Sequence, residues 1–315
     1  MKRNRYRDMK DTITLKSDKL KLVVSPKVGG SIFSMEYKYN EEWVHIMRPT
    51  PISSLEKELP GDFASFNMIP FSNRIENGIL RFKGREYILE INNLDGHTIH
   101  GEVRNKALNI KSESCTEAIM SFCSEDFDDI SWPFPFYSEV GYRFLDENTI
   151  SIDMILKNIG MSTMPGGMGI HPYFMRKLTS SDEEVILTMP IKGIYPGEDT
   201  IPTGHYVDVD DGLDFSDGKV LADDFLDNCF AIDDGDIAIE WPGSNIVLKM
   251  KKDSIFTHGI IYCPEVNREF FAIEPVTNCN NAFNMAEMNI EDTGTIYIEP
   301  GESIKGSIEI QVKKI

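Results

Sequence analysis

The chain of 315 residues carries 51 acidic and 32 basic side chains, which gives a formal net charge of −19. This charge disfavours nucleic acid and anionic membrane surfaces as partners, because binding to phosphates needs a basic surface. The apolar runs are shorter than the roughly 18 residues of a membrane-spanning helix, and the basic start of the chain lacks the apolar region of a secretory signal. An odd count of five cysteines without a Cys-x-x-Cys pair favours reduced thiols in a cytoplasmic protein over a disulfide framework or a zinc site.

Alternation of apolar and polar residues with period two is the dominant pattern along the chain. Residues 1–11 are expected to form a flexible tail, and residues 12–315 a single domain. The alternating segments, bounded by turn residues, predict strands at 12–16, 19–24, 79–91, 142–145, 149–154, 237–250, 255–263 and 306–312. Within this series Lys83-Gly84 and the segment 146–148 are natural hairpin turns.

Helical spacing is rare, and only 53–58 and 281–288 are predicted as short helices. Sixteen prolines and 23 glycines spread along the chain agree with many short strands and loops. The pattern predicts an all-β protein, a large antiparallel β-sandwich. Since each strand of a sheet points half its side chains to one face, one such face is expected to carry a concave binding groove.

Arg74 and His100 are polar groups that an apolar core does not favour. Arg74 lies between the segment 67–71 and a predicted strand, so it is either a surface arginine in an ion pair or a group that holds a ligand. His100 precedes Gly101, where the backbone can approach a ligand closely. His97 and His100 are three residues apart, and on a strand or loop this spacing does not bring both to one face, which disfavours a metal site.

His171 and Glu274 each lie in an apolar segment that a proline constrains. A histidine is the natural proton donor or acceptor near neutral pH, and Pro172 biases His171 toward extended geometry. Glu274, between Ile273 and Pro275, belongs to a predicted buried strand, where desolvation should raise the pKa of its carboxyl group. The two residues are candidates for an acid/base pair, although a histidine beside aromatic residues is also compatible with a satisfied core group.

The acidic stretch 208–227 is predicted to be a solvated loop that contains a strand or turn. At its end, Asp227 is the one acidic residue in the apolar segment 225–230. It is a weaker candidate for a ligand-holding group, because a turn residue would fit the same pattern.

These segments together resemble the aldose 1-epimerase (galactose mutarotase) family, in its broad bacterial branch. The resemblance covers the chain from about residue 20 and rests on motifs in the family's order: Asn73-Arg74-Ile75 with Asn77-Gly78, Ile99-His100-Gly101, Gly169-Ile170-His171-Pro172-Tyr173-Phe174, and Glu274-Pro275 with Asn281-Ala282-Phe283-Asn284. It implies a mutarotase-type sandwich fold that interconverts the α and β anomers of a free hexose such as glucose or galactose, without a cofactor.

The resemblance assigns Glu274 as general base and His171 as general acid in opening and closing the sugar ring. It makes Arg74, His100 and Asp227 the groups that hold sugar hydroxyls, and His100 could also orient the ring oxygen. Three aromatic residues are candidates for stacking on the sugar: Phe71, Trp132 and Tyr173.

The nature of the sugar stays open. Related enzymes act on hexose 6-phosphates, and Arg104 could contact such a phosphate or be purely structural. Arg81 and Arg85 are expected on one face of the hairpin after Arg74. A non-catalytic carbohydrate-binding protein on the same sandwich is a further alternative, and a polysaccharide-processing enzyme would need a second acidic catalyst. The oligomeric state cannot be predicted.

Overall fold

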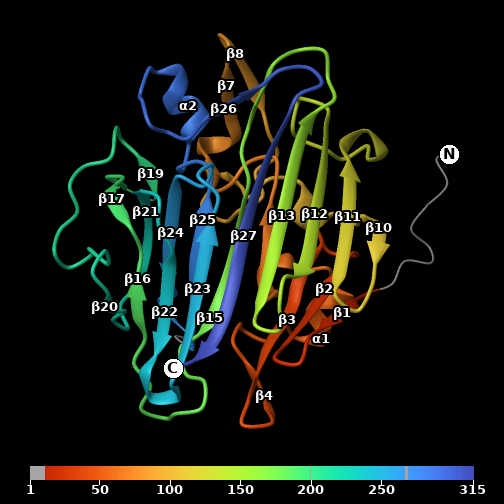
Figure 1. The fold of residues 1–315 in the computed structure, drawn as a ribbon. Helices are drawn as coiled ribbons and strands as arrows, with labels where there is room; N and C mark the ends of the chain where they lie inside the picture. The colour runs from red at the N-terminus through yellow and green to blue at the C-terminus, as the bar shows by residue number, and fades with distance from the viewer. Residues whose placement is uncertain (1–10, 199, 267–268) are drawn as a thin grey trace.

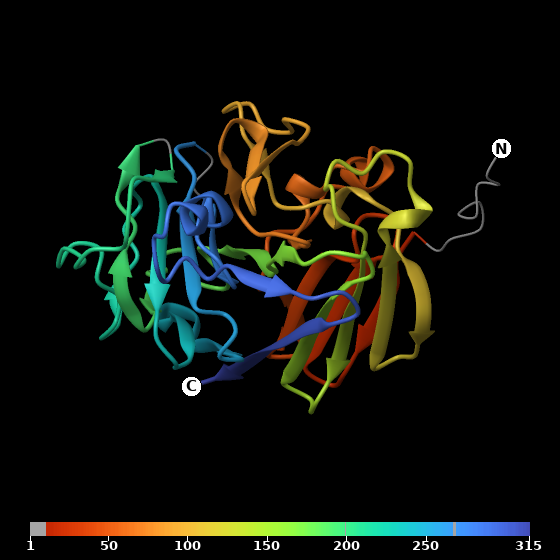
Figure 2. The ribbon, with the colours of Figure 1, turned by 90° about the horizontal axis from the view of Figure 1, so that it is seen from above.

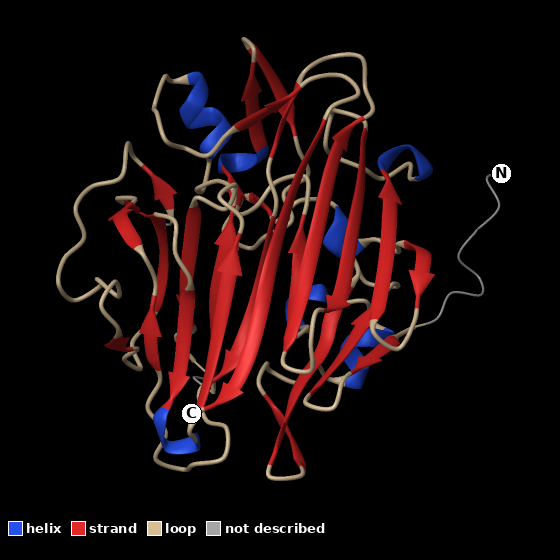
Figure 3. Cartoon of the chain, in the orientation of Figure 1, coloured by secondary structure: helices blue, strands red, loops and turns tan. Residues whose placement is uncertain are grey.

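The computed structural model describes residues 11–198, 200–266 and 269–315. Residues 1–10, most of the predicted tail, therefore lie outside the described residues. Strands dominate the described chain, with only short helices between them (Figure 3). Two large antiparallel sheets lie one in front of the other in Figure 1, and Figure 2 shows them from above. The all-β antiparallel sandwich predicted from the sequence is confirmed.

The first sheet brings together strands from both halves of the chain. In spatial order its members are β1 (Ile13–Lys16), β2 (Leu20–Ser25), β3 (Ser31–Tyr39), β5 (Ser65–Met68), β15 (Gly169–Met175), β25 (Phe270–Val276), β24 (His258–Cys263), β21 (Leu226–Ile232) and β17 (Ile191–Ile194), with β4 (Glu42–His45) paired to β3. Its central strands are therefore β15 and β25, which carry the two proline-constrained segments.

The second sheet contains the longest strands. Its spatial order is β10 (Asn109–Glu113), β11 (Glu117–Cys123), β12 (Phe136–Phe144), β13 (Thr149–Asn158), β27 (Ser303–Lys314), β23 (Ile246–Lys252), β22 (Ile237–Trp241), β16 (Ile186–Thr188) and β20 (Lys219–Val220). Alternate residues of β27, among them Ile308 and Ile310, are fully buried in the large apolar cluster between the sheets. Burial of this kind is the main favourable contribution to the stability of a sandwich.

Short paired strands and helices complete the described chain. The pairs are β6 (Arg74–Ile75) with β9 (Thr98–Ile99), β7 (Ile79–Phe82) with β8 (Arg85–Ile88), β14 (Met164–Gly166) with β26 (Ile296–Ile298), and β18 (Gly197–Glu198) with β19 (Ile201–Pro202). The α-helices are α1 (Ile52–Glu56) and α2 (Ala282–Glu287), and single 3-10 turns occupy Pro60–Asp62, Glu76–Gly78, Val103–Asn105, Ser124–Asp126 and Pro242–Ser244. Both predicted helices are confirmed to within two residues at each end. No helix among the described residues is long and apolar enough to cross a membrane.

The predicted hairpin turns are also confirmed. Lys83 and Gly84 join β7 to β8 with φ angles of 48° and 69°, the left-handed conformation that two-residue hairpins favour.

The expectation for the two arginines of this hairpin was wrong. Arg81 pairs with Glu86 and Arg85 with Phe82, so the arginines lie on opposite faces, because the tight turn inverts the alternation.

Candidate active site

The candidate site lies on the face of the first sheet that is turned away from the second sheet. On β25, Phe271 and Ile273 belong to the large cluster between the sheets, whereas Ala272 and Val276 belong to a smaller cluster on the opposite face. Glu274 alternates with the second set and therefore points to that opposite face. The same alternation on β15 turns His171 toward Glu274's side of the sheet.

Strand register brings His171 and Glu274 together. Gly169 pairs with Val276 and Tyr173 with Ala272, so His171 is directly opposite Glu274 on neighbouring antiparallel strands. The His171 Nε2 atom lies 3.0 Å from Glu274 Oε1. Two residues 103 positions apart in the chain are thus in hydrogen-bond contact through ordinary sheet pairing.

Glu274 occupies an environment that disfavours its charge. Its side chain is 2% exposed, and Oε2 is buried without a hydrogen-bond partner in the described structure. Burial raises the pKa of the carboxyl group, and the contact with His171 and the positive charge of Arg74 only partly oppose that rise. The direction is the one predicted from the apolar neighbours of Glu274 in the sequence.

Aromatic rings fix the orientation of the His171 imidazole. The ring centroid of Phe66 lies 4.6 Å away and that of Tyr173 lies 4.5 Å away. The imidazole Nδ1 is buried and has no partner in the described structure, and Tyr173 Oη lies 3.5 Å from Nε2. The edge of the imidazole that carries Nε2 therefore faces the carboxylate of Glu274.

Arg74 connects two carboxylates at the edge of the site. Its Nε donates to Asp95 Oδ2 at 2.9 Å and its Nη2 to Asp227 Oδ2 at 3.3 Å. Burial lowers the pKa of the guanidinium, but the two carboxylates outweigh it and the net shift is upward. Asp227 lies on β21, not in a turn, and burial raises the pKa of its carboxyl group although Arg74 lowers it. Sequence reasoning missed Asp95, since an Asp-Gly pair has the appearance of a simple turn.

His100 is held by an unusual backbone conformation. Its φ is +62°, that of Gly101 is +67°, and a Cβ added to Gly101 would lie 2.2 Å from the carbonyl oxygen of Ile69. Glycine is therefore required at this position. Burial, followed by the charges of Arg104 and His171, lowers the pKa of His100 well below its ordinary value, so its imidazole is neutral at neutral pH.

One cavity of about 340 Å³ contains all five predicted site residues: Arg74, His100, His171, Asp227 and Glu274. Its volume lies at the lower end of the range for small-molecule sites. The other residues that line it are mainly amides, aromatic rings and aliphatic groups: Asn73, Asn93, Ile99, Tyr173, Ile260, Tyr262 and Asn280. The cavity is thus small, polar and bounded by hydrogen-bonding groups.

Hydrogen bonds from the asparagines after β25 link two segments that line this cavity. Asn280 Oδ1 accepts a hydrogen bond from the Arg74 backbone N–H, and the Asn281 N–H donates to the Arg74 carbonyl at 2.7 Å. Asn281 also accepts from the N–H of Glu76 through its side chain. These bonds position the Arg74 segment relative to the strand of Glu274.

Of the three aromatic candidates for stacking on a sugar, only Tyr173 lines the cavity. Phe71 and Trp132 are 1% and 3% exposed, and their rings pack against each other at 5.2 Å within the large apolar cluster. The expectation for these two residues was wrong, because the segments that carry them contribute to the core.

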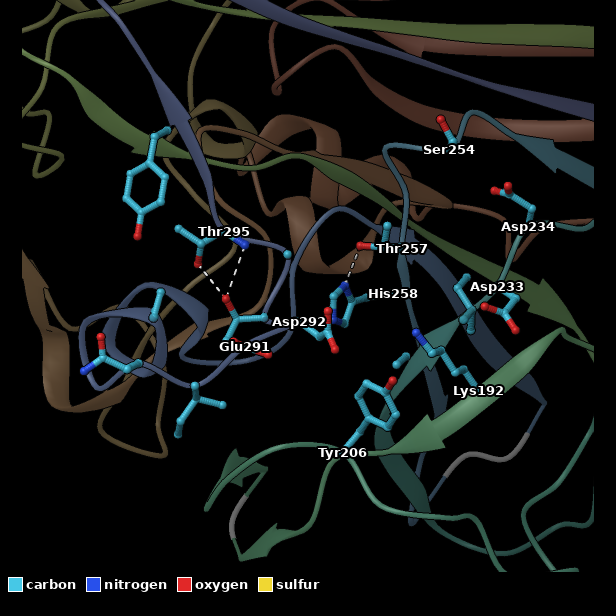
Figure 4. Close-up of a pocket in the computed structure, with 18 residues that line it drawn as sticks. Lys192, Tyr206, Asp233, Asp234, Ser254, Thr257, His258, Glu291, Asp292 and Thr295 are labelled. Carbon is cyan, nitrogen blue, oxygen red and sulfur yellow. Dashed lines mark hydrogen bonds between the residues drawn. The ribbon is translucent and has the colours of Figure 1, made fainter.

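A different cavity of about 750 Å³ contains another buried histidine, His258 (Figure 4). Its Nε2 lies 2.9 Å from Tyr195 Oη and 3.1 Å from the Asp292 carbonyl, and its Nδ1 lies 2.9 Å from Thr257 Oγ1. Burial lowers the pKa of His258 to about 4. Both ring nitrogens of His258 thus have hydrogen-bond partners, as is usual for a buried histidine with a structural role.

Fold and site together define a class: a β-sandwich protein with a buried carboxylate–imidazole pair in a polar cavity on the outer face of one sheet. The aldose 1-epimerase family model matches residues 11–311, and the chain belongs to that family. The uncharacterized protein YihR of Escherichia coli strain K12 is 31% identical over 235 residues, which cover 72% of this chain and 74% of YihR.

Solved structures show the same fold. A galactose mutarotase-like protein from Clostridium acetobutylicum superposes with a TM-score of 0.83 at 18% identity, covering 96% of this chain and 95% of its own. The GalM/aldose epimerase homologue from C. elegans gives a TM-score of 0.80 at 20% identity, covering 96% and 99%.

Proposed function

We propose that the protein is an aldose 1-epimerase that interconverts the α and β anomers of a free hexose such as glucose or galactose. The observation that carries this proposal is the 3.0 Å contact between Glu274 Oε1 and His171 Nε2 inside a cavity that also contains Arg74, His100 and Asp227. Ring opening needs a proton acceptor at the C1 hydroxyl and a proton donor at the ring oxygen. A carboxylate and an imidazole side by side supply both.

In the proposed reaction, the sugar replaces the direct contact between the pair. The Glu274 carboxylate takes the proton of the C1 hydroxyl while His171 Nε2–H gives a proton to the ring oxygen. The bond between C1 and the ring oxygen breaks, and C1 becomes an aldehyde. After rotation about the C1–C2 bond, the former ring oxygen attacks the other face of C1, and both protons return to their original groups. Neither the enzyme nor the sugar has then gained or lost a proton or an electron.

The remaining site residues hold hydroxyl groups in this proposal. Arg74 can donate and Asp227 can accept, and bonds to charged partners are the stronger ones. The neutral His100 binds or orients an oxygen and does not supply a charge, since its pKa lies well below its ordinary value. The proposal also includes a cytoplasmic location. All five cysteines are free thiols, and free thiols are typical of the reducing cytoplasm.

The test is polarimetry on freshly dissolved α-glucose and α-galactose. Glu274→Gln should lower the rate above spontaneous mutarotation by at least about 100-fold, the usual contribution of a general base. Glu102→Gln is the matched control, because burial also raises the pKa of Glu102 but its Oε1 only accepts from the backbone N–H groups of Ser131 and Trp132. A near-full rate in Glu274→Gln would remove Glu274 from the mechanism, and sugar binding without turnover by the unmodified protein would indicate a carbohydrate-binding protein.

One observation favours a hexose 6-phosphate as the second candidate substrate. Arg104 is 9% exposed, its guanidinium carbon lies 5.3 Å from the centroid of the Phe66 ring, and it has no carboxylate partner among the described residues. Burial lowers its pKa to about 10, so the guanidinium remains charged at neutral pH. The Phe66 ring also contacts His100 and His171, which puts this unpaired cation close to the cavity.

Kinetics with glucose and glucose 6-phosphate separate the two substrates. If the phosphate is the substrate, Arg104→Met lowers kcat/KM for the phosphate and leaves the rate on glucose unchanged. Equal effects on both sugars would assign Arg104 a structural role. The net charge of −19 favours the uncharged sugar.

A further inference from the structure

The His171 imidazole lacks the hydrogen bond that usually orients a histidine in an active site. A histidine that transfers a proton through one ring nitrogen commonly donates from the other nitrogen to a carbonyl or a carboxylate, and this second bond fixes the ring. In the described structure His171 Nδ1 is buried and has no partner. The orientation of the imidazole therefore depends on the rings that pack against it, those of Phe66 and Tyr173.

The Arg48 side chain packs against one of these two rings. Its guanidinium carbon lies 3.9 Å from the centroid of the Tyr173 ring and 4.5 Å from that of Phe270. A guanidinium placed over an aromatic face is attracted by the ring and restricts its movement. Arg48 is not one of the described residues that line the cavity of the acid/base pair, so its effect on that pair is indirect.

Hydrogen bonds fix Arg48 relative to both rings. Its backbone N–H donates to the Tyr173 carbonyl at 2.8 Å. Its Nη2 donates to the carbonyl oxygens of Gly61 and Phe63 at 2.7 and 2.8 Å. These two residues shortly precede β5, on which Phe66 is paired in register with the histidine. Arg48 thus links the two segments whose aromatic rings pack against the imidazole.

We infer that Arg48 is a positioning residue for the acid/base pair, which holds the Tyr173 ring and, through that ring, the imidazole of His171. This inference rests on the proposed epimerase function. In the proposed reaction the sugar replaces the direct contact between the imidazole and Glu274. The packed rings must then keep Nε2 directed at the ring oxygen, because no hydrogen bond at Nδ1 does so.

The first test is the kinetics of Arg48→Met on whichever of glucose, galactose and glucose 6-phosphate the unmodified protein turns over fastest. The variant should lower kcat about tenfold, because a small displacement of a proton donor slows the reaction. It should change KM less than about twofold, because the groups that hold the sugar hydroxyls are unaltered. Arg48→Lys retains the charge without the planar guanidinium, so its kcat should be intermediate. It is also the second variant should Arg48→Met fail to fold.

Arg176 offers a matched control at the end of β15. Its guanidinium donates to two backbone carbonyls, those of Leu221 and Ala222, and its Cζ lies 5.5 Å from the centroid of the Phe271 ring. Phe271, however, belongs to the large apolar cluster between the sheets. Arg176→Met should therefore keep kcat within about twofold of the unmodified value, even if its melting temperature falls as far as that of Arg48→Met.

A second readout observes the imidazole directly by NMR of protein labelled at histidine. The His171 ring signals are identified by their absence in His171→Asn, and they report the tautomer and surroundings of the ring. Arg48→Met should shift these signals, and Arg176→Met should not. Because Arg48 acts through Tyr173, Arg48→Met should add no further shift in protein that carries Tyr173→Leu.

The two readouts separate failure of the positioning role from failure of the epimerase function. An unchanged kcat in Arg48→Met, or an equal loss in Arg48→Met and Arg176→Met, contradicts the positioning role and leaves the epimerase proposal intact. If the unmodified protein turns over no sugar, the epimerase proposal fails, and the imidazole signals alone decide the positioning role. A shift in Arg48→Met without a shift in Arg176→Met supports that role, and unchanged signals in Arg48→Met overturn it.

Discussion

At the scale of single residues, Glu274 combines a cost in stability with the chemical role that we propose for it. A carboxylate that is 2% exposed and leaves Oε2 without a partner is less stable ionised than it would be in water. Glu274 nonetheless lines one cavity together with His171, Arg74 and Asp227, the groups of the candidate site. Active sites commonly accept such a cost in exchange for reactivity.

We therefore predict that Glu274→Gln raises the melting temperature at pH 7. The pKa of Glu274 is raised in the folded state, so the unfolded chain loses this proton at a lower pH than the folded chain. The resulting loss of stability is complete above the folded pKa and absent below the ordinary glutamate value. Calorimetry should show the variant more stable at neutral pH and the difference vanishing in acid. A lower melting temperature at pH 7 would show that the ionised carboxylate is net stabilising.

In the proposed mechanism, the raised pKa of Glu274 also sets the acid side of the activity profile. The general base must be ionised, so activity is lost as pH falls through a pKa that lies above the value of an exposed glutamate. His100 adds no limb near neutrality, because its pKa is well below its ordinary value. Rates from pH 4 to 8 should therefore fall toward acid, and a profile that stays flat down to pH 4 would contradict Glu274 as the general base.

At the scale of elements, strand register and one backbone turn build the site. The pairing of β15 with β25 sets His171 opposite Glu274, and the pairing of β6 with β9 brings His100 beside Arg74. The turn at His100 and Gly101 has positive φ at both residues and contacts the Ile69 backbone directly. The Glu102 and Val103 N–H groups also donate to the Ile69 carbonyl.

Gly101→Ala should therefore destabilise the protein and displace His100. A Cβ there would lie 2.2 Å from Ile69 O, and the φ of +67° is itself unfavourable for alanine. We expect a loss of at least about 2 kcal/mol in the free energy of unfolding, measured by urea denaturation, together with reduced activity. Gly96→Ala is the matched control, since Gly96 has a φ of +86° but no atom within 4 Å of the added Cβ. Gly96→Ala should lower the free energy of unfolding by about 1 kcal/mol. An equal loss of stability in both variants would show that the close approach of Gly101 to Ile69 does not contribute.

Elements governed by local sequence were predictable, and those that depend on packing were not. The turn at Lys83-Gly84 and both short helices follow from local propensity. Alternation predicted most of β13, β24 and β27, but it did not predict β3 or β11. The assignments of Phe71 and Trp132 failed because an aromatic residue looks the same in a core as in a binding site. The ion pair of Asp95 with Arg74 joins a loop to β6, and nothing in the local pattern around Asp95 shows that contact.

At the scale of the whole molecule, the two faces of the first sheet differ: one is packed in the core, and the other carries the candidate site. One face of the first sheet packs against the second sheet in a large apolar cluster, and the other face carries the polar cavity. Alternation in the sequence predicted such a division, and the family resemblance predicted the five residues that share the cavity. A second cavity of about 880 Å³ beside Arg74 was not predicted, because its lining residues Asn77, Phe225 and Asn228 come from segments that meet only in the folded chain.

The most direct test of the proposed function is anomer exchange of glucose and galactose in D₂O, followed by NMR at equilibrium. Ring opening and closure break no C–H bond, so the protein should accelerate exchange between the α and β C1 protons without incorporating deuterium at C2. Glu274→Gln and His171→Asn should each reduce exchange to near the spontaneous rate. Absence of any acceleration by the unmodified protein on free aldoses and their 6-phosphates, or deuterium at C2 during exchange, would contradict epimerisation by this acid/base pair.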